Sequence, residues 1–260
     1  MVNQFEATGG KFEGFRRSGA KGICATGEFI GSAEGRKIST ASAFSGKPIP
    51  VVVRFSVGGA NPKAADNAKT QRNLALQFNL PAGEIWQMGN ISAPVFGSST
   101  PEQLLGRLQS LQPDSTTKVA DPVKVKAFAD ANPEVLIQGR YFAAQAVPAS
   151  YVATNYWGVH GFGFSNAKKE KVWGKWVFEP GDNLINATAP LPEGRKKVTL
   201  GVLKIVSVSA DGSGACLNIT FDPNIMPTGV EGAADPMLRA RTAPYAISLG
   251  RRISEGSKQQ

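Results

Sequence analysis

Apolar and polar residues alternate in short segments along most of the chain, a pattern that indicates β-strands more often than long helices. The clearest segment is residues 50–59 (PVVVRFSVGG), a β-branched run typical of a strand buried on both faces. Alternation and flanking turn residues predict further strands over residues 23–30, 74–80, 84–90, 159–164, 171–180, 197–207 and 216–221, with a turn at 211–214.

Helices are predicted in the middle and at the end of the sequence. Thr100 is placed to cap one helix, with Pro101 at its first position and Gln103 in reach for a capping box. Further helices are predicted over residues 121–132, 133–145 and 236–249, and residues 1–22 form an extended arm or irregular helix. With no repeat and no linker, we expect a single α+β domain over residues 1–260, an antiparallel β-barrel-like core with packed helices.

The net charge of +9 favours an acidic partner such as nucleic acid, anionic lipid or an anionic cofactor. The basic residues are scattered, and the short clusters at 168–171 and 195–197 contain no stacking aromatics, so no nucleic-acid partner is expected. No apolar run reaches the ~20 residues that cross a bilayer, so no membrane insertion is expected. The first residues carry no secretion signal, which predicts a cytoplasmic protein, or a periplasmic one if a leader was removed.

Several classes of chemistry are excluded by what the chain lacks. Cys24 and Cys216 are far apart and outside any CxxC motif, so we expect two buried free thiols. No phosphate-binding glycine loop is present. His160 is the single histidine, which excludes multi-histidine metal sites and favours a structural, hydrogen-bonded role for it.

Two positions carry more specific chemistry. Arg241 precedes Tyr245 by four residues, which on a helix places guanidinium and phenol one turn apart on the same face. A fixed cation stabilises the phenolate, a ferric-iron ligand, although an ordinary helix with a snorkelling arginine has the same spacing. Arg54 lies inside the buried strand, where a cation needs an ion-pair partner or an anionic ligand.

Five motifs occur in one order along the chain. They are RRSGAKG from residue 16, PVVVRFS from 50, GNISAPVF from 89, GVHGFGF from 158 and RTAPYAISLGRR from 241. In this order they resemble the core of the heme catalases, and more specifically the small catalase-related peroxidases. The resemblance extends over residues 5–253.

The resemblance implies heme b bound between the barrel and the helices. Tyr245 matches the position of the proximal iron ligand, and Arg241 matches the residue that keeps that tyrosine as phenolate. Arg16, Arg54 and Arg252 match the positions that meet the heme propionates.

On the distal, peroxide-binding side, Ser56 and Asn90 match polar positions and Phe96 an aromatic position beside the heme. Gly19 stands where the family has its distal histidine, the base that moves a proton between the peroxide oxygens. Three explanations are open: a knock-out of the histidine, a pocket altered for organic hydroperoxides with Asn90 and water moving the proton, or a site that binds heme without turnover.

We therefore expect a heme-dependent peroxidase that reduces hydrogen peroxide or organic hydroperoxides with electrons from a small-molecule donor, in the response to oxidative stress. Its activity is expected to be impaired or altered because of Gly19. The alternatives are a non-catalytic heme-binding protein and a fatty-acid hydroperoxide-converting enzyme of the same fold. A homo-oligomer is a possible assembly.

Overall fold

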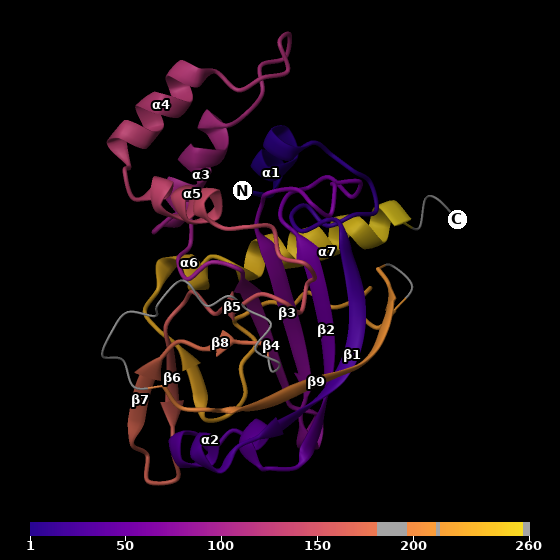
Figure 1. Ribbon diagram of the computed structural model, residues 1–260, viewed down its shortest axis with the longest axis vertical. Helices are drawn as coiled ribbons and strands as arrows, with labels where there is room; N and C mark the ends of the chain where they lie inside the picture. The colour runs from indigo at the N-terminus through magenta and orange to yellow at the C-terminus, as the bar shows by residue number, and fades with distance from the viewer. Residues whose placement is uncertain (181–196, 212–213, 257–260) are drawn as a thin grey trace.

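A curved antiparallel sheet forms the centre of the molecule in the computed structural model, which describes residues 1–180, 197–211 and 214–256 (Figure 1). The strands run in the order β8-β5-β4-β3-β2-β1-β9. Their bounds are β1 Gly22–Gly31, β2 Pro48–Val57, β3 Arg72–Asn79, β4 Ile85–Ile91, β5 Tyr156–Trp157, β8 Val177–Phe178 and β9 Gly201–Ala210. A smaller sheet has the order β10-β6-β7, with β6 Phe162–Ser165, β7 Lys171–Gly174 and β10 Val230–Gly232.

Strand β2 separates two packed faces, as its unbroken apolar run predicts. Val51, Val53 and Phe55 point into the main core, where they pack with aromatic and aliphatic side chains of β1, β3 and β4. The alternate residues of β2 point to the opposite face, where Val52 packs with Tyr245 of helix α7. The side chain of Arg54 therefore emerges on the face that α7 covers.

Most helices gather at the upper end of this sheet, where α7 crosses it, while α2 lies at the lower end (Figure 1), which confirms the predicted α+β architecture. They are α1 Val2–Gly9, α2 Ala33–Ile38, α3 Pro101–Ser110, α4 Pro122–Ala131, α5 Val135–Ala144, α6 Pro236–Arg239 and α7 Thr242–Gly256, with short 3₁₀ turns at Ser42–Phe44 and Pro81–Gly83. The Thr100 hydroxyl caps α3 by accepting from Gln103 N, as expected, while the Gln103 side chain accepts from Ser99 N. No helix among the described residues is long and apolar enough to cross a membrane.

Several predicted elements are wrong in type or extent. The strand predicted over residues 171–180 divides into β7 of the smaller sheet and β8 of the larger one. The closing helix divides into α6 and α7, because Asp235 caps α6 and a second helix begins at Thr242 and continues to Gly256. Residues 216–221 are not a strand: backbone carbonyls there accept hydrogen bonds from the side chains of Arg16 and Arg252 rather than from a neighbouring strand. Part of the predicted turn at 211–214, residues 212–213, lies outside the described residues.

The two cysteines are not free thiols as predicted but form a disulfide bond. Cys24 of β1 and Cys216 are both buried, and their Cα atoms are 5.8 Å apart across a sequence separation of 192 residues. Without a spacing motif the sequence contains no signal for this pairing. The bond fastens the turn at 216–219 to the α7-facing side of the sheet.

Loss of this bond is expected to destabilise the fold. A cross-link that closes so long a loop removes much of the entropy of the unfolded chain, so the Cys24→Ala/Cys216→Ala variant should unfold with a free energy lower by about 3–5 kcal/mol. Urea denaturation of both proteins measures the difference. Two reactive thiols in the denatured, unreduced wild-type protein would contradict the disulfide.

Candidate functional site

Tyr245 lies on the face of α7 that packs against the sheet. Arg241 Nη2 donates a hydrogen bond of 2.7 Å to the Tyr245 hydroxyl, so the pair meets one helical turn apart as the sequence predicted. The phenol approaches the sheet over Gly89, where an added Cβ would lie 3.5 Å from the hydroxyl oxygen. The lack of a side chain at Gly89 leaves space at the phenol oxygen.

A hydrogen-bonded chain continues from Arg241 to the only histidine. Arg241 Nη1 lies 2.9 Å from His160 Nε2, and His160 Nδ1 lies 2.6 Å from Asp235 Oδ2. Asp235 in turn accepts from the backbone N–H groups of Met237 and Leu238 at the start of α6. The side chains of Tyr245, Arg241, His160 and Asp235 thus form one continuous series, which we call the α7 relay.

Burial decides the protonation of this relay. Burial and the adjacent Arg241 cation lower the pKa of His160 to about 4, although Asp235 acts in the opposite direction. The imidazole is therefore neutral at pH 7, with Nδ1–H donating to Asp235 and Nε2 accepting from Arg241. Burial alone would raise the pKa of Asp235, but its hydrogen bonds with His160 and α6 hold it below the ordinary value.

The structural, hydrogen-bonded role predicted for His160 is confirmed, but its partners were missed. Asp235 is a site residue that the sequence analysis did not identify. A helix-capping Asp before Pro236 was the available signal, and it indicates a helix start rather than a partner for histidine.

The structure brings Arg16, Arg54 and Arg252 together beside this helix. Arg54 Nε donates to Asp211 at 2.9 Å and forms an ion pair with it, so Arg54 has a structural partner. Arg16 donates to the carbonyl oxygens of Cys216 and Ile219, at 2.9 and 3.2 Å. The ion-pair alternative considered for Arg54 is thus the one observed.

The cluster still carries more positive charge than its partners offset. In the described part of the chain these three guanidiniums share one carboxylate partner, Asp211, and burial with repulsion among the arginines lowers the pKa of Arg16 to about 9 and that of Arg252 to about 10. Arg252 Nη2 donates to a carbonyl at 2.7 Å, whereas its Nη1 is buried without a hydrogen-bond partner in the described part of the chain. An excess of cations with an unused donor fits an anionic group such as a pair of carboxylates.

Gly19 has the left-handed backbone conformation, with φ +63°. A Cβ there would lie 2.9 Å from the Ser56 hydroxyl oxygen and 3.5 Å from Asn73 Nδ2. Asn73 donates to Ser56 at 3.1 Å and accepts from Gln71 at 2.5 Å. The polar groups beside Gly19 are therefore the Ser56 hydroxyl and the Asn73 carboxamide, of which only Ser56 was identified from the sequence.

Asn90 is not brought together with Ser56. In the sheet Asn90 lies opposite Leu74, a residue of the main core, whereas Ser56 lies opposite Asn73. Leu74 and Asn73 are neighbours on β3 and point to opposite faces of the sheet, so the side chains of Asn90 and Ser56 do too. Asn90 accepts from Trp176 Nε1 at 2.6 Å and donates to the Leu74 carbonyl at 3.0 Å. Both hydrogen bonds are inside the main core.

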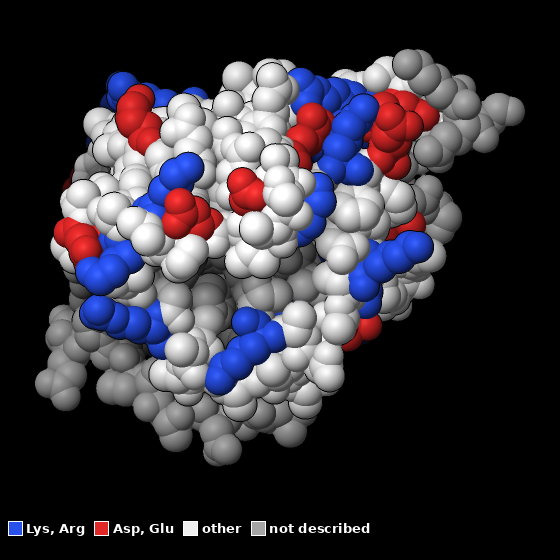
Figure 2. All heavy atoms as spheres, turned by 90° about the horizontal axis from the view of Figure 1, so that it is seen from above, with Lys and Arg blue, Asp and Glu red and all other residues white. Residues whose placement is uncertain are grey.

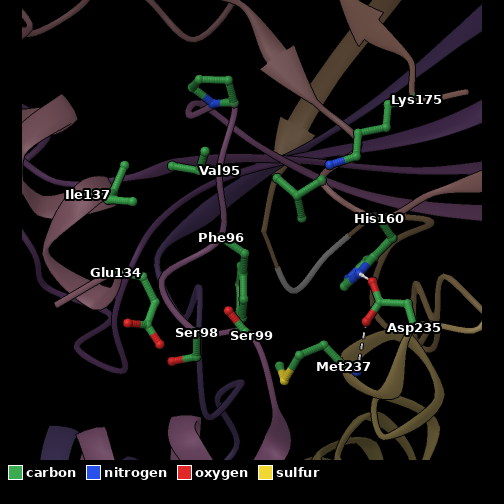
Figure 3. Close-up of a pocket in the computed structure, with 12 residues that line it drawn as sticks. Val95, Phe96, Ser98, Ser99, Glu134, Ile137, His160, Lys175, Asp235 and Met237 are labelled. Carbon is green, nitrogen blue, oxygen red and sulfur yellow. Dashed lines mark hydrogen bonds and ion pairs between the residues drawn. The ribbon is translucent and has the colours of Figure 1, made fainter. Parts of the chain in front are cut away.

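Phe96 lies at the outer end of the relay. The Arg241 guanidinium is 5.9 Å from the centre of the Phe96 ring, and the Phe96 and His160 rings are 6.3 Å apart. Phe96, His160 and Asp235 border a cavity of about 280 Å³ (Figure 3). Among the described residues no group of three or more His, Cys, Asp or Glu could hold a metal ion.

Comparison with known sequences identifies relatives of this chain. The sequence model of the catalase family matches residues 15–194. A catalase-related peroxidase of Synechococcus elongatus is 33% identical and the alignment covers 97% of this chain and 87% of the relative. A catalase-related peroxidase of Mycolicibacterium paratuberculosis is 26% identical, with coverage of 95% and 92%.

Solved structures agree with the architecture. A bacterial catalase matches with a TM-score of 0.73 at 20% identity, and a fungal catalase with 0.76 at 17%. Each match covers 94% of this chain, but the chain spans only 58% and 60% of those longer proteins. At these identities the structures bear out the predicted catalase-like fold.

The conformation of Gly19 leads to a prediction about stability. Because L-residues rarely adopt φ near +63° and a Cβ would crowd Ser56, Gly19→Ala should lower the free energy of unfolding by about 1–3 kcal/mol. Gly139→Ala is the matched control, since Gly139 lies within α5 with open space around it and should gain about 0.5–1 kcal/mol. Equal effects of the two substitutions in urea denaturation would contradict the left-handed assignment.

The buried His160 should make stability depend on pH. Its folded pKa of about 4 is below the ordinary histidine value of 6.5, so the unfolded chain takes up a proton first, and the stability contributed by the neutral imidazole is lost as pH falls from about 6.5 to about 4. The loss should amount to at most about 3 kcal/mol and be absent in His160→Gln. NMR titration of this single imidazole measures its pKa in the folded protein directly. A midpoint near 6.5 would contradict the lowered pKa.

Proposed function

This chain belongs to the catalase family, and we propose that it is a peroxidase that binds heme b through Tyr245 and reduces hydrogen peroxide or organic hydroperoxides. The related peroxidases support the broader statement that the activity is of the peroxidase or catalase type. The observation that carries the proposal is the α7 relay, which places an arginine-bonded phenol beside a surplus of buried cations.

The residues present fit such a cofactor. Tyr245 would be the iron ligand, and the hydrogen bond of 2.7 Å that Arg241 donates to its oxygen would stabilise that oxygen when it binds iron. Arg252, with its unused Nη1, and Arg16 would receive the propionate carboxylates, next to the Arg54–Asp211 pair. Bound heme would supply the iron that takes up peroxide and the redox chemistry that follows.

The Gly19 region supports an altered site rather than a simple knock-out. φ at Gly19 is in the region that favours glycine, and a side chain there would crowd the Ser56 hydroxyl. Ser56 and Asn73 can hydrogen-bond a peroxide there, but neither group is a base at pH 7. Asn73 thus takes the carboxamide role that the sequence resemblance gave to Asn90, and peroxide cleavage is expected to be slower by ~10²–10⁴ than with a positioned base.

The disulfide bears on where the protein would act. Disulfides form and persist in oxidising compartments, so the Cys24–Cys216 bond favours the periplasmic alternative over the cytoplasmic one. On the face shown in Figure 2, Lys and Arg lie interspersed with Asp and Glu, so that face offers no continuous basic patch for a polyanion. A small peroxide and a small donor are the partners we propose.

The proposal is tested by loading the purified protein with hemin. We expect a Soret absorption band typical of tyrosinate-ligated ferric heme, lost in Tyr245→Phe, and turnover of peroxide with a chromogenic donor above that of free hemin. Tyr141→Phe is the control, because Tyr141 packs against Trp157, away from α7, and should keep both properties. A protein that takes up no hemin, or a spectrum unchanged in Tyr245→Phe, would overturn the assignment.

A further inference from the structure

The cavity beside the α7 relay is bordered by segments far apart in the sequence. It has a volume of about 280 Å³ and lies between helix α5, the chain that follows β4 and the start of α6 (Figure 3). Known small-molecule pockets have volumes of ≈ 300 Å³ and more, so this one suits a molecule with a single ring. Neither Ser56 nor Asn73, the two polar groups of the proposed peroxide site, borders it.

The walls of the cavity combine an apolar side with carboxylates. Phe96 and Ile137 offer a flat and a branched apolar surface, and His160 adds a neutral ring. Charges come from Glu134 and Asp235, against the single ammonium of Lys175. Two carboxylates and one ammonium give a net charge of −1, which favours neutral or cationic ligands and disfavours anions.

We propose that this cavity is the binding site for the electron donor, a small neutral or cationic aromatic molecule such as a phenol or an arylamine. The proposal rests on the proposed peroxidase function. The donor ring packs on Phe96 and Ile137, and its hydroxyl or amino group donates a hydrogen bond to one of the lining carboxylates, Glu134 or Asp235.

The position of the cavity explains why its ligand is a donor. His160 and Asp235 border the cavity and are also the outer members of the α7 relay, which ends at Tyr245. The Phe96 ring contacts both the cavity and the Arg241 guanidinium. An aromatic ligand therefore lies in van der Waals or hydrogen-bond contact with side chains that lead to the phenol.

The overall reaction balances with two donors for each hydroperoxide. Each phenol O–H bond breaks with loss of one proton and one electron and leaves a phenoxyl radical. The hydroperoxide O–O bond accepts the two electrons and, with the two protons, becomes one alcohol and one water. Hydrogen peroxide gives two waters by the same count.

The first test uses His160 as a reporter, because a single imidazole is assigned in NMR spectra without further variants. The probes are tyramine, phenol and 4-hydroxyphenylacetate, which carry charges of +1, 0 and −1. The expected result is a saturable shift of the His160 signals, with tyramine bound at least about tenfold more tightly than 4-hydroxyphenylacetate. No shift, or equal affinity for the three probes, overturns the proposal.

The second test fills the cavity. Ile137→Trp should abolish the tyramine-dependent shift and, in the hemin-loaded protein, raise the KM for tyramine about tenfold or more. Leu136→Trp, on the same helix but outside the cavity, is the control and should keep wild-type affinity. Wild-type affinity in Ile137→Trp overturns the proposal.

Failure of this proposal is distinguishable from failure of the peroxidase function. The NMR titration uses the full chain as purified and needs neither hemin nor peroxide. If the protein turns over peroxide but binds no aromatic probe at His160, only the donor-site proposal fails. If the protein takes up no hemin, the proposed peroxidase function fails.

Discussion

The hydrogen bonds of Arg241 hold the candidate site together. One guanidinium contacts the Tyr245 hydroxyl at 2.7 Å and the His160 ring at 2.9 Å, so it links α7 to the segment before β6. This arrangement requires a neutral imidazole, because a protonated one would place two cations in contact. Burial provides that condition, and Asp235 fixes which ring nitrogen carries the proton while it also begins α6. Local helix capping and site geometry therefore depend on the same carboxylate.

The second constraint is the positive charge that the fold buries beside α7. Arg16 and Arg252 are held by backbone carbonyls of the turn at 216–219, and the Cys24–Cys216 bond fastens that turn to β1. Carbonyl groups orient the guanidiniums but do not neutralise them, so among the residues that the structure describes only Asp211 offsets the charge of the cluster. The positive charge under α7 therefore favours binding of an anion, whatever the residues near Gly19 do.

The sequence predicted those parts of the site that follow from local spacing. The contact between Arg241 and Tyr245 is a consequence of helical periodicity, and the buried face of β2 follows from its apolar run. The prediction that Arg16, Arg54 and Arg252 lie together came from the family resemblance, because no rule of local spacing relates positions so far apart in the sequence. Asn90 shows the limit of such a transfer, because the register of β3 and β4 turns its side chain into the main core and leaves Asn73 beside Gly19. The disulfide and the turn at 216–219 were missed for a similar reason: both depend on contacts across almost the whole chain.

The central claim is that the α7 relay makes Tyr245 an iron ligand in the loaded protein. Resonance Raman spectroscopy of the hemin-loaded protein, prepared with ring-labelled tyrosine, tests it most directly. The account predicts phenolate vibrations that shift with the label and weaken strongly in Arg241→Leu, because that variant loses the cation 2.7 Å from the phenol oxygen. A spectrum without tyrosinate vibrations, or one that Arg241→Leu leaves unchanged, would contradict it.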